Sequence, residues 1–94
     1  MLNVTKRALD RLSHRLARRK ADDDVALRFT RREGGWKLGT DQARPGDVSI
    51  VHDGRSVLLL DETVAQAMTN MTLDVRNTNV GPRLRLRRIA GRDE

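Results

Sequence analysis

The chain has 94 residues, a formal net charge of +6 and no cysteine. This length supports one domain, residues 1–94, with a single modest core. The lack of cysteine excludes disulfides, thiol nucleophiles and any zinc or iron–sulfur site that depends on thiolate ligands. No apolar run approaches the ~20 residues of a membrane span. The first residues carry no apolar signal-peptide core, so we expect a cytoplasmic protein that does not enter a membrane.

The positive charge is concentrated at the two ends of the chain. Residues 1–20 hold seven lysines and arginines against one aspartate, and residues 83–94 hold five against two acidic residues. The middle, residues 21–82, carries a net charge of −3. Basic segments of this kind favour an acidic partner such as nucleic acid.

The first predicted element is a helix over residues 5–20, preceded by a short strand at residues 2–4. Thr5 is a suitable N-cap because its hydroxyl can accept a hydrogen bond from an unpaired amide of the first turn. Apolar residues recur at the helical period, which predicts one buried side. They are Ala8, Leu9, Leu12 and Leu16. Four arginines, here called the arginine stripe, follow the opposite side. They are Arg7, Arg11, Arg15 and Arg18.

The pattern then changes to that of strands. Alternation over residues 25–31 predicts a half-buried strand, with Leu27 facing inward and Arg28 facing outward. The pair Gly34–Gly35 can adopt positive φ and let another group approach the backbone closely. A second short strand is predicted at residues 36–38.

The clearest local signal is a hairpin in the middle of the chain. A loop over residues 41–46, marked by a Pro-Gly pair, precedes it. Asp53–Gly54 suits a two-residue type I′ turn, whose central residues need positive φ. The apolar run at residues 57–60 shows little alternation, which predicts a strand covered on both faces.

The remaining residues predict one short helix and two more strands. Asp61 is expected to cap the helix. The strands are predicted at residues 72–75 and 82–88, the second with leucines inward and arginines outward. The sheet region then extends over about residues 25–89, and a short charged tail follows at residues 90–94. Short connections favour antiparallel pairing, so we expect an α+β fold with mostly antiparallel strands.

Six segments, covering roughly residues 2–86, follow the pattern of a known family in order and spacing. They are the helix start Val4–Leu12, the strand Val25–Arg28, the glycine loop Glu33–Gly39, the hairpin Asp47–Asp61, the segment Met68–Asp74 and the segment Gly81–Leu86. Together they resemble the HesB/IscA-like domain of A-type iron–sulfur carriers. The resemblance implies two small packed sheets, as a flattened barrel or sandwich, with an N-terminal helix and one short helix.

The residues that give this family its function are missing. A-type carriers bind iron or a cluster through one cysteine after the glycine pair and two more in a Cys-x-Cys tail. Trp36 stands at the first of these positions, and the tail has no cysteine. An indole cannot ligate a metal, so Gly34, Gly35 and Trp36 form a degenerate ligand loop. No catalytic, cofactor-binding or metal-binding residue carries over from the family.

Trp36 has two interpretations. An exposed indole would be a stacking platform for a base or a flat ligand. We favour packing on the sheet or at a dimer contact, in the space that the family leaves for its cofactor.

A few other residues are candidate metal ligands, namely His14, His52 and the aspartates at residues 22–24. They lack the spacing of a known metal site. We therefore expect no metal and no cofactor.

The sequence contains no nucleophile–base motif, P-loop or dinucleotide-binding motif, so we expect no enzymatic activity. We expect a non-catalytic binding or scaffold protein of unknown pathway, related to iron–sulfur biogenesis by descent only. Its partner would be an unidentified protein or a second copy of the chain. The alternative is a small basic nucleic-acid- or ribosome-associated protein. Such a protein would use the arginine stripe for weak, non-specific contacts with phosphates.

Overall fold

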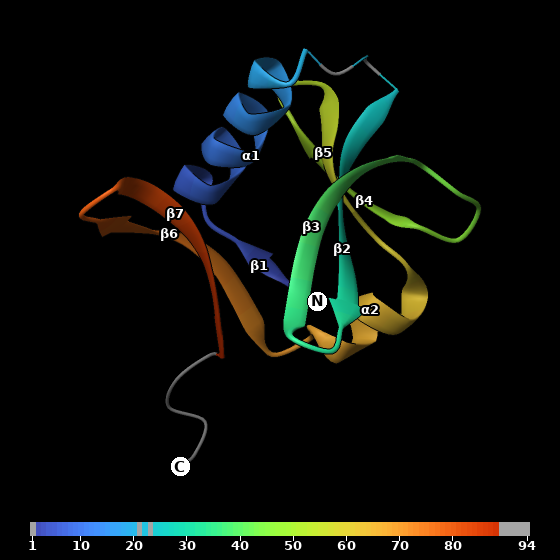
Figure 1. Cartoon of the computed structure of the whole chain (residues 1–94). Helices are drawn as coiled ribbons and strands as arrows, with labels where there is room; N and C mark the ends of the chain where they lie inside the picture. The colour runs from blue at the N-terminus through green and yellow to red at the C-terminus, as the bar shows by residue number, and fades with distance from the viewer. Residues whose placement is uncertain (1, 21, 23, 89–94) are drawn as a thin grey trace.

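A computed structural model describes residues 2–20, 22 and 24–88 (Figure 1). These residues form two helices and seven strands. In chain order they are β1 (Asn3–Val4), α1 (Lys6–Arg18), β2 (Val25–Arg32), β3 (Gly35–Gln42), β4 (Val48–His52), β5 (Arg55–Leu60), α2 (Glu62–Ala67), β6 (Met71–Thr78) and β7 (Gly81–Arg88). The expected α+β class is confirmed. Residue 89 of the expected sheet region and the expected tail at 90–94 lie outside the described residues.

The strands form two small sheets. One has the order β1-β6-β7 and the other the order β3-β2-β5-β4, and they do not join into a closed barrel among the described residues. The pairs β2–β3, β4–β5 and β6–β7 are antiparallel, whereas β1–β6 and β2–β5 are parallel. The prediction of mostly antiparallel strands is therefore confirmed. No helix in the described part of the chain is long and apolar enough to cross a membrane.

Helix α1 packs against strands of both sheets and supplies much of the core. It ends at Arg18, two residues before the predicted end. The hydroxyl of Thr5 accepts a hydrogen bond from the Ala8 amide at 3.2 Å and donates one to Asp74 Oδ1 at 2.9 Å. The predicted N-cap therefore also joins the start of α1 to β6. Leu12 and Leu16, on the predicted apolar side, are fully buried.

Strand β5 lies at the centre of the core. Its residues 57–60 are at most 1% exposed, as predicted, because α1 and α2 both pack against this strand. In the turn before it, Asp53 and Gly54 have φ values of 53° and 77°, which are the positive values that a type I′ turn needs. In the loop after it, Asp61 Oδ1 accepts a hydrogen bond from the Val64 amide at 2.8 Å and caps α2.

Arg28 departs from the predicted alternation of β2. The pattern placed it outward, but its side chain is only 7% exposed. Its Nε donates to Asp41 Oδ2 at 2.9 Å, and its Nη2 donates to Asp47 Oδ2 at 2.5 Å. We call these three residues the Arg28 network. A guanidinium is buried at acceptable cost only with such partners, and the two aspartates provide them by covering this face of β2.

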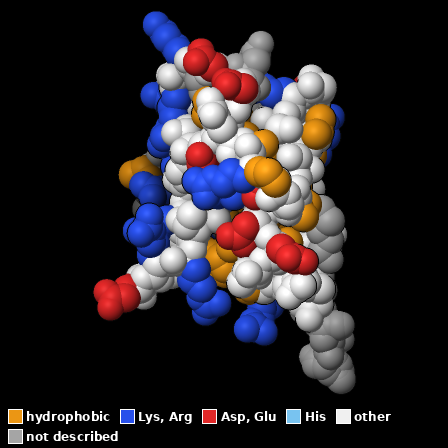
Figure 2. All heavy atoms as spheres, turned by 90° about the vertical axis from the view of Figure 1, so that its right-hand side faces the viewer, with side chains coloured by type: hydrophobic (Ala, Val, Ile, Leu, Met, Phe, Trp, Pro, Cys, Tyr) orange, Lys and Arg blue, Asp and Glu red, His pale blue; other side chains and the backbone are white. Residues whose placement is uncertain are grey.

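The loop between β3 and β4 is shorter than predicted because β3 extends to Gln42. This loop and α2 lie on the side of the molecule that Figure 2 shows. Lysine and arginine side chains lie among aspartates and glutamates on this face. Here charges of opposite sign are close together, in contrast to the side that carries α1.

Candidate functional site

The glycine pair and Trp36 are the first candidate site. Gly34 lies in the turn between β2 and β3, and Gly35 and Trp36 are the first residues of β3. Gly35 has a φ of +116°, which favours glycine. A Cβ atom at either glycine would meet no heavy atom within 4 Å. The pair therefore serves a tight hairpin turn, and no other described residue packs closely against it.

Trp36 is half-buried and packs at the margin of the core. Its ring meets Phe29 edge-to-face, with 6.3 Å between the ring centroids. The guanidinium carbon of Arg31, its cross-strand partner, lies 5.3 Å from the indole centroid. Both kinds of contact are favourable. Arg31 thus lies over the ring, where a stacked base would otherwise lie.

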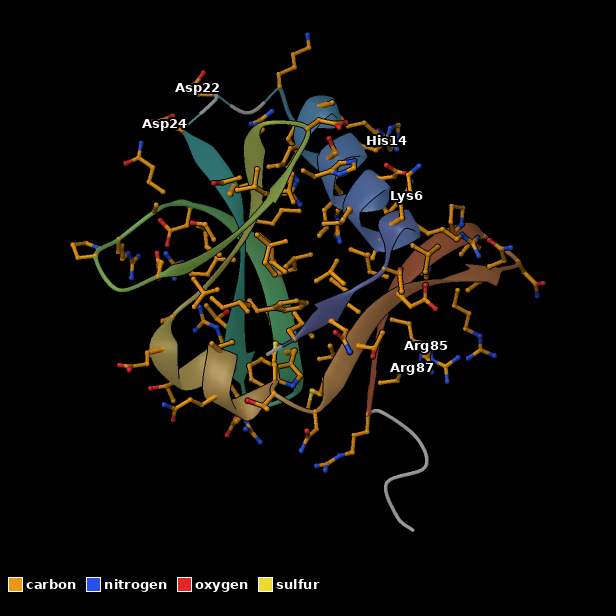
Figure 3. The ribbon with its side chains drawn as sticks, turned by 180° about the vertical axis from the view of Figure 1, so that it is seen from behind. Lys6, His14, Asp22, Asp24, Arg85 and Arg87 are labelled. Carbon is orange, nitrogen blue, oxygen red and sulfur yellow. The ribbon has the colours of Figure 1, made fainter. Side chains whose placement is uncertain are left out.

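The candidate metal ligands that the structure describes do not come together, and Asp23 lies outside the described residues. The described part of the chain holds no group of three or more histidine, aspartate or glutamate side chains that could bind a metal ion. His52 Nε2 lies 2.9 Å from Asp10 Oδ1 and 3.5 Å from Asp53 Oδ2, which ties the β4–β5 turn to α1. Figure 3 shows His14 on α1, well apart from Asp22 in the segment that follows the helix.

The arginine stripe is the second candidate site, and all four of its residues lie on α1 as predicted. Arg7 and Arg18 are exposed, whereas Arg11 and Arg15 are half-buried. Arg11, Arg15 and Arg18 make no ion pair with any other described residue. Three guanidiniums on one side of the helix therefore lack a carboxylate partner in this part of the chain.

Arg11 and Arg15 line a groove between α1 and the β6–β7 hairpin. Its volume is about 390 Å³. The hairpin residues that line it are Val80, Pro82, Arg83 and Leu84. A second hollow of about 320 Å³ continues along the helix to Arg18 and Arg19. Two arginines of the stripe, Arg11 and Arg15, thus lie on one wall of the groove, and the hairpin forms the other.

Folding places the basic helix α1 beside the β6–β7 hairpin, which carries the described part of the second basic end. β1 pairs with β6, and α1 packs on β6. Residues 6–20 and 71–88 together hold twelve lysines and arginines against two aspartates, whereas residues 22 and 24–70 hold six against eight acidic residues. Figure 3 shows Arg85 and Arg87 on β7, pointing away from α1. The shared charge of the two ends is visible in the sequence, but their proximity is a tertiary feature.

The positive charges on α1 repel one another. Burial lowers the pKa of Arg15, and the positive charges of Arg19 and Arg11 lower it further. A guanidinium remains protonated in proteins, so this environment reduces the stability of the fold instead of changing the charge. A bound anion would offset the repulsion, and arginine binds phosphate groups well because of its planar set of donors.

Comparison with known proteins identifies the fold. No protein-family model and no curated protein matches the chain. Among solved structures, SufA of Escherichia coli, a protein involved in the biosynthesis of iron–sulfur clusters, matches with a TM-score of 0.68 and 21% identity. The match covers 93% of this chain and 84% of SufA. The chain has the HesB/IscA fold.

Two further structures share the HesB/IscA fold. A crystal structure of IscA with a [2Fe-2S] cluster matches with a TM-score of 0.56 and 17% identity, over 94% of this chain and 82% of IscA. A protein from Aquifex aeolicus matches with a TM-score of 0.66 and 20% identity, over 92% of this chain and 89% of that protein. The architecture that the motif order implies is therefore confirmed.

The residues of this chain do not fit an iron–sulfur cluster. There is no cysteine anywhere in the sequence. Trp36, which follows the glycine pair, offers only an N–H donor and is packed against Phe29 and Arg31. The HesB/IscA fold is thus present without the thiolate donors that the resemblance assigns to it.

Proposed function

We propose that this protein is a non-catalytic binding or scaffold protein of the cytoplasm that uses the HesB/IscA fold without carrying iron or a cluster. The fold it shares with SufA and IscA supports descent from iron–sulfur biogenesis proteins. The observation that carries the proposal is the donor set, since the chain has no cysteine and Trp36 follows the glycine pair. Its role would then be to bind another protein or a second copy of itself.

Anaerobic reconstitution with ferrous iron and sulfide tests this proposal. After desalting, we expect no visible absorption band and no stoichiometric iron, because no thiolate is available. The variant Trp36→Cys should also fail to bind iron stoichiometrically, since the two tail ligands of the family are still absent. Stoichiometric iron on the parent protein would overturn the proposal.

A second candidate function is weak, sequence-independent binding of nucleic acid through the arginine stripe. The observation that favours it is the position of Arg11 and Arg15, which line a groove and have no carboxylate partner among the described residues. Guanidiniums suit phosphate oxygens, which they can bind in pairs. Contacts with about three or four phosphates release counterions, so affinity should fall roughly tenfold or more between low and physiological salt.

Fluorescence anisotropy with labelled nucleic acid at several salt concentrations tests this second candidate. The double reversal Arg11→Glu with Arg18→Glu should abolish binding without unfolding the protein, because neither side chain belongs to the core. As a matched control, Arg32→Glu with Lys37→Glu makes the same charge change at exposed positions of β2 and β3 and should keep most of the binding. Equal binding by the stripe variant and the parent would reject the candidate.

A further inference from the structure

The far end of the β6–β7 hairpin projects from the fold (Figure 1). β1 pairs with β6 only at Thr72 and Leu73, so the rest of the hairpin is a two-stranded ribbon. Residues 76–80 are all exposed, and Val80 is 75% exposed. We call residues 76–83 the hairpin tip.

The hairpin tip has a well-defined turn and carries two adjacent arginines. Thr78 Oγ1 donates a hydrogen bond to the Gly81 carbonyl at 2.7 Å and accepts one from the Val80 amide at 3.2 Å. Gly81 has a φ of +109°, which favours glycine at this position. Arg76 and Arg83 are direct cross-strand partners. Like charges in such positions repel each other.

No carboxylate of the ribbon neutralises this pair. Asp74 is the one acidic residue of β6 and β7. Its Oδ2 lies 3.6 Å from Arg87 Nη2, and its Oδ1 accepts a hydrogen bond from Thr5. Arg76 and Arg83 make no ion pair with any residue that the structure describes. The hairpin tip therefore presents two unneutralised guanidiniums on an ordered turn.

Arg83 connects the hairpin tip to the arginine stripe. Val75 and Leu84, which are cross-strand partners, pack against the core, and the pair Arg76 and Arg83 follows them toward the tip. Arg83 lines the groove together with Arg11 and Arg15. A groove of a double helix has a phosphate backbone on each side. A duplex whose groove received the hairpin tip would therefore bring one of its phosphate backbones against Arg11 and Arg15.

The dimensions of the ribbon also suit a duplex. Paired strands lie about 4.8 Å apart, and the major groove of B-DNA, about 12 Å wide, admits a two-stranded ribbon. Within that groove, guanine offers the O6 and N7 acceptors that arginine binds in a bidentate manner. The major groove of A-form RNA is too deep and narrow for side chains to reach its bases.

We propose that the hairpin tip enters the major groove of double-stranded DNA. Arg76 and Arg83 contact the base edges, and Arg11 and Arg15 contact the adjacent phosphate backbone. The inference rests on the second candidate under the proposed function. It adds duplex DNA as the ligand and the hairpin tip as a second contacting element.

Protection of duplex DNA from dimethyl sulfate tests this inference, because the reagent methylates guanine N7 in the major groove. We expect the parent protein to protect N7 at low salt. Arg76→Gln with Arg83→Gln should remove the protection and weaken duplex binding about tenfold or more. As a matched control, Arg32→Gln with Lys37→Gln removes the same charge from β2 and β3 and should keep the protection.

The variants separate this inference from the proposal on which it rests. The hairpin variant, Arg76→Gln with Arg83→Gln, removes a like-charge repulsion. Its thermal unfolding temperature should therefore be no lower than that of the parent. If it is lower, each single Arg→Gln change is tested instead. Unchanged N7 protection by the hairpin variant, with binding lost in Arg11→Glu with Arg18→Glu, would overturn the inference and support the second candidate.

Other ligands give distinct results. Tighter binding of a single-stranded oligonucleotide or of duplex RNA than of duplex DNA would overturn the inference. Tighter binding of poly-L-glutamate than of duplex DNA at equal charge concentration would assign the surface to an acidic protein and would also overturn it. No binding of the parent to any of these nucleic acids at low salt would overturn the inference and the second candidate together.

Discussion

Arg28 in β2 and Arg15 in α1 carry the same charge in two differently built halves of the molecule. Arg28 is buried, and its pKa is raised chiefly by the hydrogen bond to Asp47. Arg15 is half-buried next to other arginines, has no carboxylate partner in the described residues, and has a lowered pKa. The comparison separates an arginine with two carboxylate partners from arginines that have none among the described residues.

The Arg28 network also holds the loop between β3 and β4 in place. Arg28 Nη2 donates to the Gln42 carbonyl at 3.2 Å, and Asp47 Oδ2 accepts a hydrogen bond from the Arg44 amide at 2.7 Å. Each carboxylate in this network is satisfied from more than one side. The two halves should therefore respond differently to mutation, pH and salt.

The largest effect is expected from Arg28→Met. The change leaves Asp47, whose side chain is 4% exposed, as an uncompensated buried charge. It should destabilise the protein by about 3–5 kcal/mol, measured by urea denaturation. The double variant Arg28→Met with Asp47→Leu should recover much of the loss, because fewer unpaired charges remain. A loss of only about 0–1 kcal/mol would mean that the Arg28 network contributes no more to stability than an exposed ion pair does. Arg28 would then not differ from Arg15 in its effect on stability.

A smaller effect is expected from Trp36→Ala, in the same half of the molecule. Trp36 is only half-buried, so the loss should be about 1–3 kcal/mol, below the roughly 3–5 kcal/mol of a fully buried aromatic side chain. The native emission of the single tryptophan should be blue-shifted and should move to longer wavelength on unfolding. Native emission like that of tryptophan in water would show that Phe29 and Arg31 do not cover the ring.

Mutations in the two halves should also change the stability of the protein at acidic pH to different extents. The hydrogen bond from Arg28 is the main cause that holds the pKa of Asp47 below its usual value. Its contribution to stability is fully present above the unfolded pKa of about 3.9 and is lost as the pH falls through the lower folded pKa. In the variant Asp47→Asn, the free energy of unfolding should fall less between neutral and acidic pH than in the parent, as measured by urea denaturation at each pH. Arg15→Gln should lose as much stability in acid as the parent does. An equal reduction of the acid-induced loss in both variants would contradict the role given to Asp47.

The smallest effect is expected from Arg15→Gln itself. The change removes a charge that is repelled by Arg19 and Arg11, so stability should stay within about 0.5 kcal/mol of the parent or rise slightly. Any gain should shrink at high salt, because salt screens the repulsion. Thermal or urea unfolding at two salt concentrations measures the change in stability and its dependence on salt. A loss comparable to that of Arg28→Met would mean that Arg15 is also a structural arginine.

The sequence by itself determined the local elements of this protein. Thr5 and Asp61 cap the two helices, and the type I′ turn forms at Asp53–Gly54. The buried side of α1 follows from the spacing of its leucines. Each of these depends on residues no more than a few positions apart, so the pattern of neighbouring residues is sufficient. The order of these elements also resembled the HesB/IscA pattern, which the fold confirms.

Only the tertiary structure decided the features that distinguish the two halves. Alternation along β2 placed Arg28 outward, because the pattern of one strand does not show that Asp41 and Asp47, 13 and 19 residues away, cover its outer face. The groove likewise joins Arg11 to Arg83 from opposite ends of the chain. Which distant segments meet depends on the packing free energy of the whole chain, and a local pattern of residue types does not contain that information.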